Sequence, residues 1–443
     1  MTKWSTVYNK FYNVVNMKSE FYKNKLKNNN KISKATKSIS DVEFNGNRIV
    51  FHHLNHHMSV SYFLRGLKKY IRKGIKNFEL DFSGIDNQIF PNAVVPIAAI
   101  IKYYTNSGIV FQGFLPPALE KMNFLNPVKY NDSKDALNKL WTFKTSEDVA
   151  ILVDAYILHI SKLDAFPKGF LNATEWALNE VMDNVIQHSN AEEGFVMGQL
   201  HPKTSHIAFT VFDLGQGIFN SFKGSKYHPR NAVDAITLAL QEEITRDKRI
   251  GQGNGLFGLS SLIKQGDSRL KITSGSGYYS YQYGSSKTFN KAPIISDTHS
   301  MTSIDFMLDY SKDVSIEEAL VFNGKKYIPT SLRIENMEDI NGNIYFRISE
   351  KSNGTGTREA AILLKNQIIN ILNDEPKIVI LDFSGISVVS SSYSDELIAK
   401  LFCDLGLFQF NNLIRIKGLS HEQQLILQKS VIQRIIENFN KTN

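Results

Sequence analysis

Three short motifs within residues 172–264 constrain this chain of 443 residues more than any other feature. In residues 172–188, apolar side chains recur at helical spacing, which leaves Glu180, Asn184 and His188 one turn apart on a polar face. A carboxylate placed there can orient or deprotonate water, and an amide oxygen is a suitable ligand for Mg²⁺. The pairing of Glu180 with Asn184 therefore favours phosphate chemistry, whereas we interpret His188 as a hydrogen-bonded structural residue.

The second motif follows a predicted strand over residues 206–212, which places Asp213 at a strand end. Gly215 and Gly217 come directly after it, and glycines let the backbone approach a ligand closely. A carboxylate in this position can accept a hydrogen bond from the amino group of adenine. The motif is thus predicted to hold a nucleotide base.

The third motif is a glycine-rich loop, Gly251-Gln-Gly253-Asn-Gly255, that opens a predicted helix over residues 256–263. The first amides of a helix have no partner within the helix, and its dipole is positive at that end. The loop is therefore predicted to hold phosphate.

In this order the three motifs resemble the GHKL, or Bergerat-fold, ATP-binding superfamily of gyrase-type, chaperone, histidine-kinase, mismatch-repair and anti-sigma-factor proteins. Each motif alone has a purely structural explanation: the first could be a solvated helix face, the second a turn and the third a flexible loop. The resemblance implies ATP and Mg²⁺ as cofactors of a domain over residues 142–310, and a basic lid near residues 246–249. It implies these roles: Glu180 as catalytic base, Asn184 as Mg²⁺ ligand, Asp213 and Thr302 at adenine, and the backbone of Gly215, Gly217, Gly251, Gly253 and Gly255 around the ligand.

Charge and composition bear on whether the protein contacts nucleic acid, spans a membrane or works in the cytoplasm. The net charge is +8, and residues 1–40 account for it with nine lysines against Glu20. Aromatic residues recur there at near-helical spacing, so we favour an amphipathic packing or oligomerisation helix over a nucleic-acid contact. The longest apolar run, residues 93–101, is far shorter than the roughly 20 residues that a membrane helix needs. With Cys403 as the single cysteine, we expect a cytoplasmic protein.

An internal duplication surrounds the predicted ATP-binding domain. The hexapeptide Leu-Asp-Phe-Ser-Gly-Ile occurs at residues 80–85 and again at 381–386, each time followed by a predicted helix, strand and helix. We therefore expect an α/β protein in which two small modules, residues 41–141 and 346–443, flank the central domain. Residues 311–345 would connect it to the second module, and residues 274–300 would form a hairpin insertion.

The second copy resembles the STAS-like family, and a bacterial domain of unknown function with a helical Arg358-Glu359-Ala360 segment and a serine-rich turn before Asp395-Glu396. In STAS proteins of anti-anti-sigma type, the serine that a GHKL kinase phosphorylates lies just before a helix. Ser391 matches that serine, although Ser390 stands in place of the acid and Tyr393 in place of the glycine. We favour a hydroxyl that caps the helix start over phosphorylation.

One further cluster contains His52, His53, His56 and His57. Spacing of four residues on a helix can bind a metal, but no carboxylate or cysteine lies close in sequence. We interpret the cluster as polar surface.

These observations predict a cytoplasmic Mg-ATP-binding regulatory switch, a slow ATPase whose nucleotide state controls its STAS-like modules or a protein partner. One alternative is a protein-serine kinase that acts on a STAS partner or on Ser391. Another is a non-catalytic interaction protein with a structural ATP. Two related modules also favour self-association, for example as a dimer.

Overall fold

The computed structural model describes residues 40–85, 88–131, 135–241, 255–266, 268–290, 301–312, 316–322 and 337–442, with residues 314, 325, 326 and 334. Residues 1–39 of the lysine-rich segment, the basic residues 246–249, Gly251 and Gly253 lie outside these ranges. Helices and strands are mixed throughout, which confirms the α/β class.

A sheet of eight strands forms the centre of the molecule, in the order β11-β10-β9-β12-β8-β7-β6-β5. Its neighbours are antiparallel except β5 and β6. The strands are β5 (Val128–Lys129), β6 (Trp141–Phe143), β7 (Gly194–His201), β8 (His206–Asp213), β9 (Arg269–Ser274), β10 (Gly277–Gln282), β11 (Ser285–Phe289) and β12 (Thr302–Asp309). The sheet thus includes strands before the predicted boundary at residue 142, and the predicted hairpin forms its β10-β11 edge.

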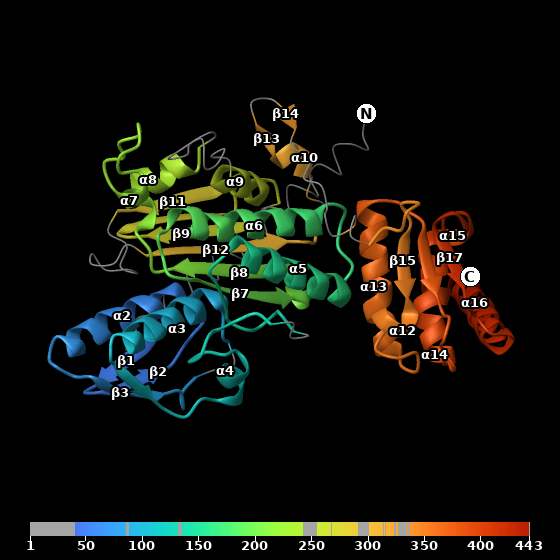
Figure 1. Ribbon diagram of the computed structural model, residues 1–443, viewed down its shortest axis with the longest axis horizontal. Helices are drawn as coiled ribbons and strands as arrows, with labels where there is room; N and C mark the ends of the chain where they lie inside the picture. Colours follow the sequence, from blue (N-terminus) through green and yellow to red (C-terminus); the bar gives the residue numbers. More distant parts are fainter. Residues whose placement is uncertain are drawn as a thin grey trace, which may run out of the picture.

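One face of this sheet is covered by helices α5 (Ser146–Leu163), α6 (Phe170–His188) and α9 (Gly255–Gln265) (Figure 1). Strand side chains alternate between faces, so Phe209, Ile272 and Ile304 join the apolar core beneath these helices. Short helices α7 (Gly217–Ser221) and α8 (Ala232–Ala239) lie near the β10 end of the same layer.

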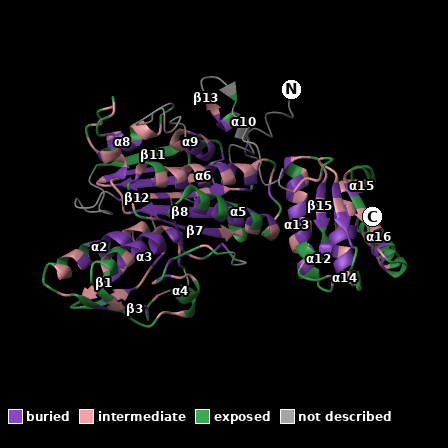
Figure 2. Ribbon diagram, viewed as in Figure 1, coloured by how far each residue is buried: buried purple, intermediate pink, exposed green. Residues whose placement is uncertain are grey.

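The opposite face is covered by the first module. Its helices α2 (His57–Ile71) and α3 (Pro91–Asn106) lie between the central sheet and a second sheet of order β1-β2-β3-β4 (Figure 1). Phe195, Met197 and Phe212 of the central sheet belong to the core of this module. Helix α3 is accordingly buried over most of its length (Figure 2). The remaining elements are β1 (Val42–Asn45), β2 (Arg48–Phe51), β3 (Asn77–Asp81), β4 (Val110–Gln112) and α4 (Pro117–Lys121).

The C-terminal module has a core of its own, around a parallel sheet of order β15-β16-β17. Ile344 and Ile334 contribute to that core, so the module takes in residues before its predicted start at 346. Its elements are β15 (Ile344–Arg347), α12 (Ile348–Lys351), α13 (Arg358–Asp374), β16 (Val379–Asp382), α14 (Ser391–Ser394), η2 (Asp395–Ala399), α15 (Lys400–Leu413), β17 (Ile414–Lys417) and α16 (His421–Thr442). The predicted connector contains α10 (Ile316–Ala319), β13 (Val321–Phe322) and β14 (Lys325–Lys326).

The two copies of the hexapeptide occupy equivalent places. Strands β3 and β16 each lie between two parallel neighbours. At the end of each strand the aspartate accepts a hydrogen bond from a serine amide two residues later, Ser83 to Asp81 and Ser384 to Asp382, both at 2.9 Å. The first module differs by the additional antiparallel strand β1. The repeated sequence therefore corresponds to a repeated strand and turn.

Candidate functional site

Helix α6 organises the predicted site. It begins after Gly169, whose φ of +78° belongs to the left-handed region that favours glycine. Leu178, Val181 and Met182 are buried in the core beneath the helix. Glu180 and Asn184 lie on a different face of α6, as the helical spacing predicted.

The first and third motifs meet at the start of α9. A Cβ atom placed on Gly255 would lie 2.3 Å from Oε2 of Glu180 and 3.5 Å from Nδ2 of Asn184. The backbone of α9 is therefore in close contact with the Glu180 carboxylate, and a side chain at Gly255 would displace that carboxylate. Gly255 is the part of the glycine-rich loop that the structure describes.

The surroundings of these two side chains are unusual for polar groups. Burial, with a smaller effect of nearby Asp183, raises the pKa of Glu180 to about 7. Nδ2 of Asn184 is shielded from solvent and has no hydrogen-bond partner among the described residues. An unsatisfied buried amide costs free energy, so its presence beside a carboxylate with a raised pKa indicates a place for a ligand.

The second motif lies against the C-terminal end of α6. The Gln216 amide donates to the Ser189 carbonyl at 2.7 Å, and its side-chain Nε2 donates to the His188 carbonyl at 2.7 Å. A Cβ atom on Gly215 would lie 2.2 Å from the same Ser189 oxygen. Gly217 has a φ of +75° where the chain turns into α7. Glycines are thus required by close packing at Gly215 and by backbone conformation at Gly217.

Asp213 ends β8 and is only 3% exposed. Its Oδ1 accepts a hydrogen bond of 2.8 Å from the Gly215 amide. Burial raises the pKa of Asp213 to about 7, although that hydrogen bond acts in the opposite direction. Burial of a carboxyl is costly for folding, and buried carboxyls with a raised pKa occur often at functional sites.

A hydroxyl pair adjoins Asp213 on the neighbouring strands. Thr302 lies opposite Asp213 in the register of β12 and β8, and its Oγ1 lies 3.1 Å from Oγ of Ser274. Ser274 also accepts a hydrogen bond of 2.8 Å from the Ile218 amide. Ser274 ends β9 and was not among the predicted site residues, although its place at a strand end resembles that of Asp213.

Ser391 lies far along the chain, in the C-terminal module. It is the exposed first residue of α14, and the hydroxyl of Ser390 caps this helix by accepting from the Tyr393 amide at 3.0 Å. The predicted capping hydroxyl is therefore that of Ser390. Arg358 of α13 contacts the buried Glu396 at 3.1 Å, so the helical segment and the acidic turn singled out in the sequence lie together.

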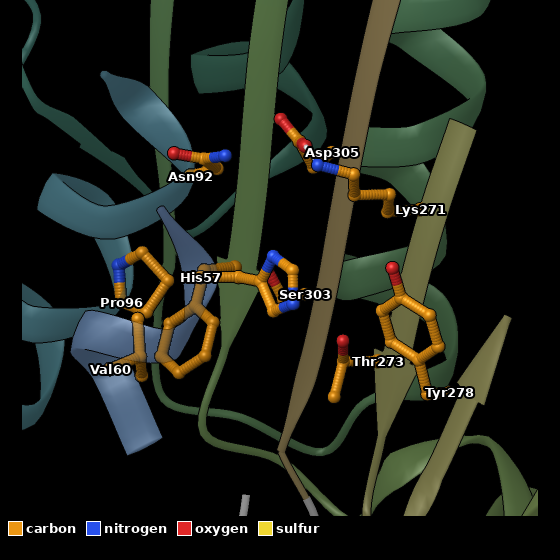
Figure 3. A pocket seen from close by; sticks show the side chains of 10 residues that line it. His57, Val60, Asn92, Pro96, Lys271, Thr273, Tyr278, Ser303 and Asp305 are labelled. Atoms are coloured by element: carbon orange, nitrogen blue, oxygen red, sulfur yellow. Dashed lines mark ion pairs between the residues drawn. The ribbon is translucent and has the colours of Figure 1, made fainter. Parts of the chain in front are cut away.

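A small cavity of about 20 Å³, lined by polar and apolar side chains, lies on the opposite face of the central sheet, between this sheet and α2 and α3 (Figure 3). It has room for about one water molecule. Phe212, Thr273 and Ser303 line it, and each precedes or follows Asp213, Ser274 or Thr302 in sequence.

At this cavity one member of the histidine cluster, His57, departs from the interpretation as polar surface. His57 stacks on Tyr278 with ring centroids 5.7 Å apart, and burial lowers the pKa of His57 to about 3. His56 caps α2 by accepting from the Met58 amide at 3.2 Å. Among the described residues, no group of three or more potential metal-binding side chains comes together. His57 therefore belongs to the packing between the first module and the central sheet, whereas His56 is exposed at the start of α2.

Comparisons with known proteins bear on the C-terminal module. No curated protein matches the chain. Residues 360–424, which run from α13 to the beginning of α16, match a STAS-like domain of unknown function (DUF4325), and the chain therefore carries a STAS-like domain.

Among the helices of the described ranges, none combines the length and the apolar character needed to cross a membrane.

Proposed function

We propose that the polar face of α6, together with the start of α9 and the strand end at Asp213, binds Mg-ATP in the manner of the GHKL superfamily. The observation that carries this proposal is the contact of all three motifs with one helix. Gly255 lies against Glu180 in the middle of α6, while Gly215 and Gln216 lie against the end of the same helix. Residues far apart in sequence thus contact the same helix.

The donors and acceptors fit an adenine nucleotide with magnesium. Asp213 is a buried acceptor for the adenine amino group, and the Thr302 and Ser274 hydroxyls are beside it. The Asn184 amide, once turned, offers a hard oxygen ligand to Mg²⁺. Gly255, which begins α9, supplies backbone next to the predicted base Glu180, whose raised pKa suits proton transfer near neutral pH.

The favoured activity is slow ATP hydrolysis in a regulatory protein of the cytoplasm. Glu180 would orient the water, and the nucleotide state would act on the STAS-like domain or on a protein partner. The exposure of Ser391 favours the alternative of a serine kinase that acts on a STAS partner or on Ser391. In the third alternative, bound ATP only stabilises the fold.

Self-association through the C-terminal module is part of the proposal. Several apolar side chains on α15 and α16 are exposed, among them Phe408 at 83%, Ile432 at 58% and Phe439 at 67%. Exposed apolar side chains that follow one helix face are typical of a protein contact surface. A second copy of the chain would present the same surface, which permits a symmetric dimer.

The test incubates the purified full-length chain with γ-labelled ATP and Mg²⁺, and follows free phosphate and labelled protein together. Free phosphate that disappears in Glu180→Ala supports hydrolysis. Label on the protein that disappears in Ser391→Ala supports the kinase alternative. Bound ATP with neither product leaves the structural role, and the absence of binding rules out the site itself.

A further inference from the structure

The STAS-like domain is attached to the central layer by side-chain amides. Helix α13 lies beside the end of α5 and the connector to α6 (Figure 1). Asn370 is 1% exposed. Its Nδ2 donates to the carbonyls of Ser161 and Asp164, both at 2.8 Å, and its Oδ1 accepts from the Phe166 amide at 2.7 Å. One side chain thus satisfies three backbone groups at the end of α5 and in the segment that joins α5 to α6.

Three more residues of α13 extend this contact. Asn366 donates to the Lys162 carbonyl at 3.2 Å, and Asn373 donates to the Phe166 carbonyl at 3.0 Å. Asp374 accepts from the amide of Gly169, the residue that precedes α6, at 2.9 Å. We refer to the side chains of Asn366, Asn370, Asn373 and Asp374, with their backbone partners, as the amide seam.

The chemistry of the seam follows from the helix ends that it covers. The last carbonyls of α5 and the first amides before α6 have no partners within their own helices. Side chains of α13 supply those partners, so the geometry of the connector depends on the STAS-like domain being in place. Water can also satisfy these groups, which makes the contact reversible in a way that apolar packing is not.

The two modules differ in this respect. The first module shares an apolar core with the central sheet through residues such as Phe195 and Phe212. The core of the C-terminal module contains no residue of the central sheet among those described. An interface of hydrogen bonds between separate cores is the kind that opens while each part stays folded.

We propose that the amide seam is the joint through which the state of the α6 site reaches the STAS-like domain. This inference rests on the proposed function, because α6 carries Glu180 and Asn184 and begins at the seam. A ligand that shifts α6 changes the positions of the Phe166 and Gly169 amides relative to α13. Two arrangements follow, one with the seam closed and one with it open, and nucleotide changes their ratio.

Hydrogen exchange of the full-length chain measures the joint directly. Exchange of the Phe166 and Gly169 amides is compared without nucleotide, with Mg-ADP, and with Mg²⁺ and a non-hydrolysable ATP analogue. We expect at least one nucleotide state to change these rates by roughly tenfold, within the usual range of coupling between sites. Calorimetry under the same conditions establishes that each nucleotide is bound.

Asn370→Asp should open the seam without changing the size of the side chain. The carboxylate keeps the acceptor for the Phe166 amide but loses both donor hydrogens. The matched control is Glu359→Gln, an isosteric exchange at an exposed position of α13. In Asn370→Asp the Phe166 and Gly169 amides should exchange rapidly in every nucleotide state. Because coupling between two sites is reciprocal, this change should also alter nucleotide affinity, by the same factor as that by which nucleotide alters the opening of the seam. Glu359→Gln should behave as wild type.

Asn373→Ala removes only the bond to the Phe166 carbonyl and serves where Asn370→Asp unfolds the domain. Confirmed nucleotide binding with unchanged exchange at Phe166 and Gly169 would overturn the joint and leave the ATP site intact. No nucleotide binding by wild type would overturn the proposed function, and the joint with it.

Discussion

Replacement of Asp213 by asparagine should make the folded protein more stable while it weakens nucleotide binding. The carboxyl is 3% exposed, and burial raises its pKa from an ordinary value of 3.8 to about 7. An acid whose pKa is raised by folding destabilises the folded state when it ionises. Stability is therefore lost as the pH rises from about 4 to about 7, and the full cost is present above pH 7.

The magnitude follows from the same pKa values. A difference between 3.8 and about 7 corresponds to a cost on the order of 4 kcal/mol at high pH. Asparagine keeps the oxygen that accepts from the Gly215 amide and has no charge to bury. A domain of this size gains roughly 2 to 4 °C in Tm per kcal/mol, so a rise on the order of 10 °C is expected at pH 8.

Calorimetric melting of wild type and Asp213→Asn at pH 5 and pH 8 measures this effect. The gain in Tm should be larger at pH 8, because the folded wild type carries a protonated carboxyl at pH 5. Asp404→Asn, an isosteric change at an exposed position, is the control and should leave the Tm within about a degree. A lower Tm for Asp213→Asn at pH 8, or an equal gain at both pH values, would refute the reasoning about burial.

Three further changes test other parts of the account. Glu180→Gln should bind ATP with wild-type affinity but lose phosphate release by at least roughly a hundredfold, measured with a phosphate sensor, because it removes only the base. Gly255→Ala should fold and still lose phosphate release, because its Cβ would lie 2.3 Å from the Glu180 carboxylate and displace it; wild-type release would contradict the contact. Ile432→Glu should leave the Tm within about 1 °C and lower the molar mass of any oligomer in light scattering, since Ile432 is 58% exposed. An unchanged oligomer would place self-association elsewhere.

Much of the site could be predicted because its parts are short and local. Helical spacing placed Glu180 and Asn184 on one face, and a strand end placed Asp213. Ser274 was missed because a lone serine after a strand has no spacing pattern; only the pairing of β9 with β12 brings it to Thr302.

The arrangement of the modules could not be predicted in the same way. Residues 93–101 belong to the helix that was predicted after the first hexapeptide, and they were also weighed as a membrane segment. A helix that is apolar on all sides is equally typical of burial between two layers, which is the place of α3. The asparagines of α13 resemble a solvated helix face in sequence. Their role depends on the end of α5, about 200 residues earlier in the chain, and no local pattern indicates that contact.

Titration calorimetry with Mg²⁺ and a non-hydrolysable ATP analogue tests most directly whether one nucleotide binds at the polar face of α6. The wild-type chain should bind one equivalent. Asp213→Asn, although more stable, should lose roughly 1.5 to 3 kcal/mol of binding free energy, because it replaces a charged acceptor. Glu180→Gln should bind as wild type. No heat of binding to folded wild-type protein, or equal affinity in Asp213→Asn, would contradict the account.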